Sequence, residues 1–171
     1  MEDVARLLNS MREAGVISDY ALFGAVAQMR YTEAVATIDA DVLVAVPAPD
    51  RLDVFGPIYD FCRARGYTPE GESVRVGAWP VQFVPVFSQL TRHALTEAEN
   101  ADFDGMVLRV VSAAYLAVIA LSVGRAKDVA RVIALLESGA VTREALAVLA
   151  GREGLDTAWS RFVARFPDNE R

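Results

Sequence analysis

The chain has little cysteine, histidine or positive charge, and each shortage excludes a class of function. With a single cysteine, Cys62, no internal disulfide can form, and its neighbours in a helical pattern indicate a buried thiol. The single histidine, His93, lies in a polar segment with no histidine or cysteine partner for a zinc site. No serine or cysteine stands in a nucleophile-elbow context, so the sequence gives no support for a catalytic triad.

Basic residues are outnumbered, because 17 Lys and Arg face 23 Asp and Glu, for a net charge of −6. The acidic residues are spread along the chain, so no basic surface is expected to hold a phosphate backbone. Binding to duplex nucleic acid is therefore not expected.

Long apolar runs are also missing. The most apolar stretch, 106–123, contains Arg109 and Ser112, which favours a buried strand and a core helix over a membrane span. The first fifteen residues carry charges from the second position onward, so we expect a helix there and not a signal peptide. From these patterns we expect a cytoplasmic protein with no membrane role.

The length of 171 residues suits one compact domain, or a small α/β unit with a helical appendage. Hydrophobic periodicity up to residue 84 predicts the order helix, strand, helix, strand, helix, strand, strand. The expected ranges are an opening helix ending at Gly15, then 20–23, 25–31, 37–47, 52–65 ending at Gly66, 73–76 and 80–84. The last two form a hairpin.

After Pro85 the pattern becomes mainly helical. We expect a polar helix over 90–100, a short strand over 106–111, and then helices separated by glycines. Ser112 and Thr142 are expected N-caps of two of these helices. The sequence thus suggests an α/β core over 1–87 and a mainly helical part over 88–171, packed together.

Two carboxylates stand at the start of the clearest strand, in TIDADVLVAVP. Side chains alternate across a strand, so Thr37, Asp39 and Asp41 are expected to share one face. Two like charges this close repel unless a cation neutralises them, and oxygen ligands suit Mg²⁺ or Mn²⁺. The chemistry implied is phosphoryl or nucleotidyl transfer. The alternative is an idle, solvated pair at an exposed strand end.

A glycine turn precedes this pair. Gly24 and Ala25 end one strand and open a helix, where backbone N–H groups are able to hold a phosphate. Taken alone, a glycine at such a position usually only makes the turn.

The segment LFGAVAQMRYTEAVATIDADVLV resembles the signature of the polymerase-β-like nucleotidyltransferase superfamily. In that signature a Gly-Gly or Gly-Ser pair is followed, about a dozen residues later, by Asp-x-Asp. A second block, GRAKDVARVIALLESG, looks like the Arg-x-Lys-Asp helix of the AbiEii-type branch, whose members are toxin-like minimal nucleotidyltransferases.

The resemblance implies an α+β (α/β) fold, with a small mixed sheet flanked by helices and a C-terminal helical bundle. It also implies roles for particular residues. The glycine turn at Gly24 and Ala25 would hold the triphosphate, and Asp39 and Asp41 would hold Mg²⁺ or Mn²⁺. The candidate nucleotide-binding residues are completed by Thr37, Arg125 and Lys127. The implied partners are an NTP and a protein such as an antitoxin.

Asp128 has a structural interpretation beside the functional one. It borders the apolar stripe of its helix, where a charge needs a partner, and Arg125 at i−3 or Arg131 at i+3 can supply it. By periodicity alone Lys127 is a surface lysine.

The sequence departs from the family pattern at two positions. Ala25 lacks the hydroxyl that a serine would offer to a phosphate. In PVQFVP, Gln82 stands where members of the family usually carry a third carboxylate, and an amide cannot act as a base. Activity would then be low, rely on another acid such as Glu97 or Asp104, or be lost.

Three functions follow from these residues. The first is an Mg²⁺-dependent enzyme that moves a nucleoside monophosphate from an NTP to a hydroxyl acceptor. The second is a catalytically silenced module that binds nucleotide or a protein partner, which Gln82 favours. The third is a helical interaction protein in which the Asp-x-Asp is accidental.

Overall fold

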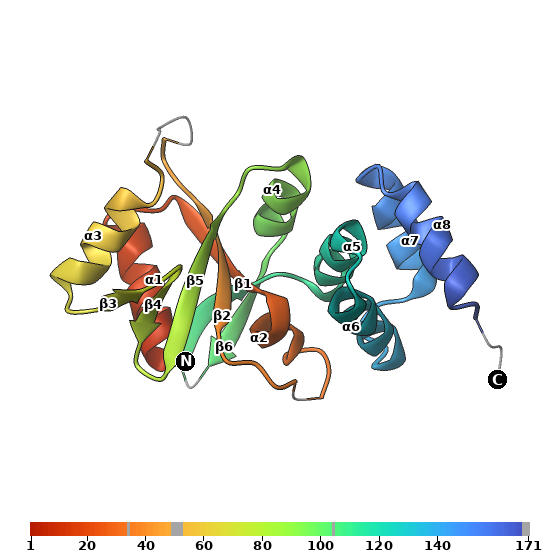
Figure 1. Ribbon diagram of the computed structural model, residues 1–171, viewed down its shortest axis with the longest axis horizontal. Helices are drawn as coiled ribbons and strands as arrows, with labels where there is room; N and C mark the ends of the chain where they lie inside the picture. Colours follow the sequence, from red (N-terminus) through yellow and green to blue (C-terminus); the bar gives the residue numbers. More distant parts are fainter. Residues whose placement is uncertain (34, 49–52, 104, 169–171) are drawn as a thin grey trace. The chain divides into compact units, whose positions relative to one another are not determined.

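The computed structural model describes residues 1–33, 35–48, 53–103 and 105–168. The chain forms two compact units (Figure 1). The first comprises Met1–Ala27 and Val35–Val111, and the second comprises Gln28–Ala34 and Ser112–Arg171. Each unit is described by itself below.

The first unit is built on a mixed sheet with the strand order β3-β4-β5-β2-β1-β7-β6. β2 pairs with β5 and β1 with β7 in parallel, and the other neighbours are antiparallel. The strands are β1 Asp19–Phe23, β2 Ala40–Ala45, β3 Thr68–Glu70, β4 Ser73–Val76, β5 Trp79–Pro85, β6 Glu99–Phe103 and β7 Met106–Val110. The expected α+β class and the 73–84 hairpin are confirmed.

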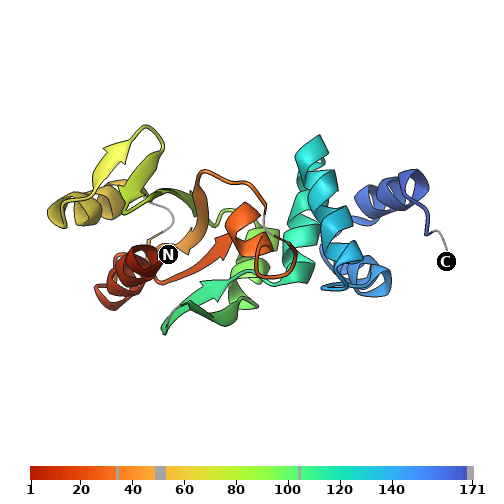
Figure 2. The same ribbon diagram turned by 90° about the horizontal axis from the view of Figure 1, so that it is seen from below.

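Helices cover both faces of this sheet. α1 and α3 lie together on one face and α4 lies on the other (Figure 1, Figure 2). The helices of this part are α1 Glu2–Glu13, α2 Gly24–Gln28, α3 Gly56–Ala64 and α4 Gln89–Thr96. α1 is amphipathic and buries Val4, Leu7, Leu8 and Met11, which are the residues at helical spacing in the sequence. The hydroxyl of Tyr20 in β1 donates to Asn9 Oδ1 of α1 at 2.8 Å.

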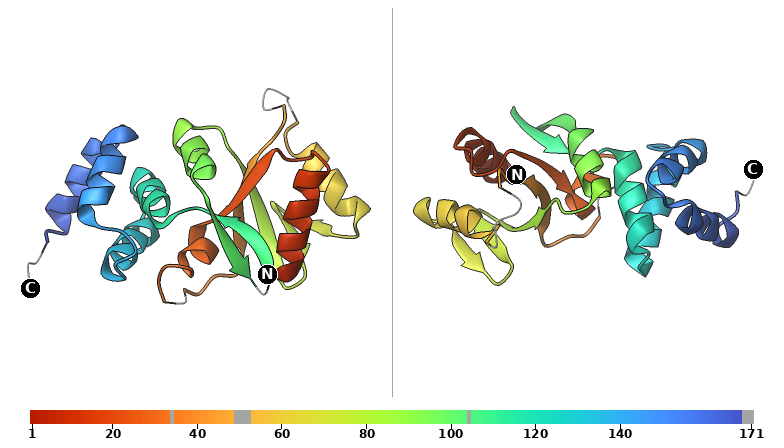
Figure 3. Two further views of the ribbon diagram at one scale, coloured as in Figure 1. Left: turned by 180° about the vertical axis from the view of Figure 1, so that it is seen from behind. Right: turned by 90° about the horizontal axis from the view of Figure 1, so that it is seen from above.

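The second unit is helical. α5 packs against α6 and α7, and α7 packs against α8 (Figure 3). The four helices are α5 Ala113–Val123, α6 Ala126–Glu137, α7 Arg143–Arg152 and α8 Asp156–Arg165. Ser112 and Thr142 are the N-caps of α5 and α7, as the sequence predicts, because each hydroxyl accepts a backbone N–H of the first turn. No helix in the described ranges has the length and apolar character that crossing a bilayer requires.

Some expected boundaries were wrong. The strand expected over 37–47 covers only Ala40–Ala45, and the helix expected over 25–31 ends at Gln28. The helix expected over 90–100 ends at Thr96, and β6 follows it. β6 buries only Ala101, so this polar edge strand carries no alternation that sequence reading could detect. Residue 52, the expected start of the third helix, lies outside the described residues.

Cys62 is fully buried on α3, as expected for a structural thiol. Burial raises the pKa of this thiol to about 11. The thiolate, which is the reactive form, is therefore suppressed at neutral pH.

Candidate functional site

The register of the sheet aligns three strands at Asp41. Asp41 in β2 pairs with Phe23 in antiparallel β1 and with Gln82 in parallel β5. Directly paired residues of neighbouring strands project from the same face of a sheet. The side chains of Phe23, Asp41 and Gln82 therefore form one row, and Gln82 stands directly beside the candidate metal ligand.

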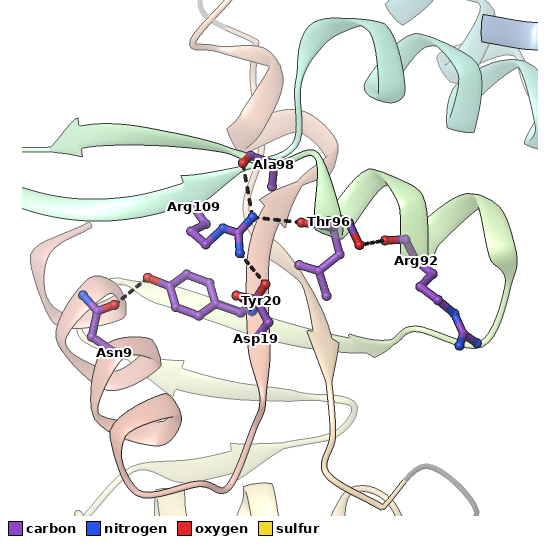
Figure 4. A network of polar contacts seen from close by, with 8 residues as sticks. Asn9, Asp19, Tyr20, Arg92, Thr96, Ala98 and Arg109 are labelled. Carbon is purple, nitrogen blue, oxygen red and sulfur yellow. Dashed lines mark hydrogen bonds and ion pairs between the residues drawn. The ribbon is translucent and has the colours of Figure 1, made fainter.

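This row lies on the α4 face of the sheet. Asp19, on the same face of β1 as Phe23, forms an ion pair with Arg109. The Arg109 guanidinium also donates to the carbonyl oxygens of Leu95 at 3.0 Å and Ala98 at 3.2 Å, at the end of α4 (Figure 4). The half-buried arginine thus ties α4 to β1 on that face.

Gly24 lies directly against Asp41. It has a φ of +68°, and a Cβ built at this position would come within 2.3 Å of Asp41 Oδ2. Only glycine combines this conformation with such a close approach. The glycine turn and the carboxylate are therefore in contact, although 16 residues of chain separate them.

Asp39 immediately precedes β2. The hydroxyl of Thr37 donates to Asp39 Oδ1 at 3.1 Å and to the Asp39 carbonyl oxygen at 3.0 Å. This turn replaces the extended strand that the sequence suggested for Thr37, because a short polar side chain satisfies the backbone locally. Thr37 thus forms a hydrogen bond with the Asp39 carboxylate. Binding of nucleotide by Thr37 stays a prediction.

Glu72 is a neighbour of the site that sequence reasoning missed. Gln82 Nε2 donates to Glu72 Oε2 at 3.5 Å, which is a long hydrogen bond. Glu72 lies in the turn before β4, and Ser73 pairs with Gln82. The hairpin register would have located Glu72, but the sequence alone leaves the register open.

Within the ranges that the structure describes, no three Asp, Glu, His or Cys side chains are grouped as a metal site would need. Asp39 and Asp41 alone fit a magnesium ion that keeps water and takes substrate phosphates as its remaining ligands. Two carboxylates are too few to bind a metal ion tightly without ligands from water or substrate.

Asp128 is buried at the start of α6 and has two arginine partners. Arg125 Nε donates to Asp128 Oδ2 at 2.8 Å, and Arg131 Nη1 lies 3.8 Å from Oδ1. The expected ion pair is thus confirmed with both arginines. The hydrogen bond to Asp128 raises the pKa of Arg125.

A second buried polar residue joins this network. Arg131 Nε donates to Gln28 Oε1 at 3.0 Å, and Gln28 and Asp128 are the buried polar residues of the described chain. Gln28 ends α2, the helix that Gly24 begins. Sequence reasoning missed Gln28, because nothing in its neighbourhood distinguishes it from a surface amide.

The other candidate residues of the described chain lie on α2, on α6 and at the end of α4. Ala25 follows Gly24 in α2 and is half-buried, and Lys127 is exposed on α6. An approach of Lys127 and Arg125 to the carboxylate pair stays a prediction. Glu97 is the C-cap of α4. Asp104 lies outside the described residues.

No protein-family model matches the chain. No curated protein matches it in sequence either.

Solved structures do resemble it. A crystal structure of an antigenic nucleotidyltransferase-like protein from Paracoccidioides brasiliensis is 12% identical, covers 93% of both chains and has a TM-score of 0.55. This likeness shows a nucleotidyltransferase-like fold.

Two structures of ANT(2″)-Ia resemble the chain more weakly. The crystal structure with adenylyl-2″-tobramycin is 10% identical, with coverages of 95% and 97% and a TM-score of 0.48. The solution structure of this antibiotic-resistance factor is 11% identical, with coverages of 96% and 94% and a TM-score of 0.45.

Proposed function

We propose that the protein is a nucleotidyltransferase that uses Mg²⁺ or Mn²⁺ to move a nucleoside monophosphate from an NTP to a hydroxyl acceptor. The observation that carries this proposal is the contact between the Asp41 carboxylate and Gly24. It brings a candidate metal ligand to a glycine turn within a nucleotidyltransferase-like fold.

In this reaction the oxygen of the acceptor hydroxyl forms a bond to the α-phosphorus of the NTP. The bond from that phosphorus to the bridging oxygen breaks, and pyrophosphate leaves. Asp39 and Asp41 would hold the metal ion, which when bound offsets the negative charge of the phosphates. The turn at Gly24 and Ala25 would bind the triphosphate through backbone N–H groups, and Lys127 and Arg125 would contact phosphates.

The hydroxyl proton needs an acceptor, and Gln82 cannot serve because its amide is not a base. Glu72, at hydrogen-bond distance from Gln82, is the carboxylate that the structure offers at this end of the row. We assign it as the candidate proton acceptor, either directly or through one water molecule.

The second candidate function is a silenced module that keeps nucleotide binding and acts through a protein partner such as an antitoxin. Gln82 beside Asp41 favours it, because the position directly across from the metal ligand carries no charge. Membership of the AbiEii-type, toxin-like branch is compatible with either function, and we keep it as part of both proposals.

Thermal unfolding with metal and nucleotide tests both. We expect Mn²⁺ with the preferred NTP to raise Tm, because a ligand at a hundred times its Kd adds about 2.7 kcal/mol to stability. Metal alone should have a small effect, since magnesium sites with few protein ligands stay weak until phosphates bind.

The double variant Asp39→Asn with Asp41→Asn should lose this shift while its unliganded form is as stable as the wild type or more so. The control is Glu13→Gln with Asp60→Asn, which removes two exposed charges elsewhere in the first unit. Incubation with labelled NTPs in a cell extract then separates the two functions. Labelled product supports the transferase, and a shift without product supports the silenced module. No shift with any NTP removes both.

A further inference from the structure

A groove of about 530 Å³ lies at the start of β2 and β5. Its lining consists of Thr37, Ile38, Arg75, Ala78, Trp79 and Pro80. Ala40 at the start of β2 pairs with Val81, and Pro80 precedes Val81, so the groove begins two positions before the row that holds Asp41 and Gln82. It is formed within the first unit.

The wall of the groove is apolar and open to solvent. Ile38 is 86% exposed, the largest exposure of the big apolar side chains in the described chain. Trp79 and Pro80 remain half-buried beside it. A single exposed apolar residue is ordinary, but an exposed isoleucine that shares a groove with tryptophan and proline offers continuous area for a ligand.

The charged side chain that lines the groove, Arg75, already forms an ion pair. Arg75 Nε donates to both carboxylate oxygens of Glu70 at 3.1 Å, and Nη2 lies 3.0 Å from Oε2. This hydrogen bonding lowers the pKa of Glu70 and raises that of Arg75. With its charge balanced by Glu70, Arg75 gives the groove little attraction for a triphosphate.

Hydrogen-bonding capacity is equally limited. The Thr37 hydroxyl donates to Asp39 and the Arg75 guanidinium to Glu70, and the other lining side chains are apolar apart from the Trp79 indole N–H. Recognition of a nucleobase needs several donors and acceptors, which this lining does not provide. An apolar ring is the better match.

The groove is linked to the carboxylate pair through one residue. Thr37 lines the groove and donates to the Asp39 carboxylate at 3.1 Å, whereas Gly24 contacts the Asp41 carboxylate. The glycine turn and the groove thus contact different members of the pair. A triphosphate at the glycine turn and an acceptor in the groove would therefore each adjoin a different carboxylate.

We infer that this groove binds an apolar, ring-bearing part of the hydroxyl acceptor, an inference that rests on the proposed transferase function. The chemical class is a neutral molecule that carries an aromatic or alicyclic ring close to its hydroxyl. The ring contacts Ile38 and Trp79, and the hydroxyl is presented toward Asp39.

The test is a titration of the ¹⁵N-labelled full chain with 2-naphthol, followed through the tryptophan indole N–H resonances. The chain has two tryptophans, and Trp159→Phe assigns them. We expect a saturable shift of the Trp79 resonance and none of Trp159. Ile38→Ser should weaken binding about fivefold or more, because it removes apolar contact area. Val148→Ser, which changes another exposed apolar side chain, should leave binding unchanged.

Adenosine and sorbitol serve as the competing probes. An equal shift of Trp79 by adenosine would assign the groove to the nucleobase, and an equal shift by sorbitol would remove the preference for rings. Either result overturns the inference, as does the absence of a naphthol-induced shift. The titrations contain neither metal nor NTP, so a failure of the groove is distinguishable from a failure of the transferase assignment.

Discussion

At the scale of single residues, Gly24 has two separate reasons to be glycine. Its φ of +68° disfavours any side chain, and the Asp41 carboxylate occupies the space that a Cβ would fill. Gly24→Ala should therefore cost about 1–2 kcal/mol of unfolding free energy from the backbone alone. It should also displace the carboxylate and remove the Tm shift by Mn²⁺ with NTP.

Gly15 provides the matched control for this prediction. It has the same φ of +68°, but a Cβ there would meet nothing within 4 Å. Gly15→Ala should show a similar backbone cost in urea unfolding and keep the full ligand response. If both variants respond to Mn²⁺ and NTP like the wild type, the contact between Gly24 and Asp41 has no role in binding.

Gln82 determines whether the row on β1, β2 and β5 carries one charge or two. Gln82→Asp puts a second carboxylate directly across from Asp41, so the unliganded variant should be less stable than Gln82→Asn by about 0.5–1 kcal/mol. Mn²⁺ should reverse this order, because the added oxygen ligand strengthens its binding. Equal Mn²⁺ shifts for Gln82→Asp and Gln82→Asn would place the metal away from this row.

The site residues differ in how far the sequence predicts them. The motif spacing suggested Gly24, Asp39 and Asp41 as candidates, and the structure brings Gly24 and Asp41 into contact. Glu72 was not predictable, because its approach to Gln82 depends on the register of a hairpin. Register is set by long-range packing and turn geometry, which one sequence does not display.

At the scale of elements, local chemistry predicted the starts of α5 and α7 better than it predicted edge strands. Ser112 and Thr142 cap their helices through bonds within one turn, so a short sequence window contains the cause. β3 and β6 lie at the two edges of the sheet, where few residues are buried. Edge strands of this kind are stabilised by pairing with a neighbouring strand, and no local hydrophobic pattern predicts them.

The start of α6 gives a prediction about an element. Asp128 is buried and accepts hydrogen bonds from the backbone N–H of Arg125 at 3.2 Å and from its side chain. Asp128→Asn should lower the free energy of unfolding by about 1–3 kcal/mol, since it weakens these bonds and leaves Arg131 without its charge partner. Arg125→Gln should cost clearly less, because the Arg125 side chain is 62% exposed and solvent screens its ion pair.

Urea unfolding measures both variants, with Asp156→Asn on α8 as a control for removal of an acid from a first helical turn. A loss for Arg125→Gln as large as for Asp128→Asn would contradict the assignment of Asp128 as the centre of the network. It would make the surface ion pair the main stabilising contact of this helix start.

At the scale of the whole molecule, the two units are interleaved in sequence. Residues 28–34 belong to the helical unit, although they lie between β1 and β2 of the sheet unit. α2 therefore begins in one unit and ends in the other. The sequence could not show this, because the Gln28 contact with Arg131 spans 103 residues.

The residues that we propose as nucleotide contacts belong to both units, and Lys127 allows this proposal to be tested. It is the only lysine of the chain, so acylation of amines by an N-hydroxysuccinimide ester modifies only Lys127 and the amino terminus. If the phosphates held at Asp39 and Asp41 also contact Lys127, then Mn²⁺ with NTP at ten times its Kd should slow Lys127 acylation about tenfold.

The amino terminus serves as the internal reference, and peptide mass spectrometry follows both sites in one reaction. Asp41→Asn, in the other unit, should abolish the protection of Lys127 without changing the rate for the unliganded protein. Protection that survives in Asp41→Asn would mean that the helical unit binds nucleotide by itself. An unchanged Lys127 rate, under conditions in which nucleotide raises Tm, would remove Lys127 from the site and leave the sheet unit as the whole of it.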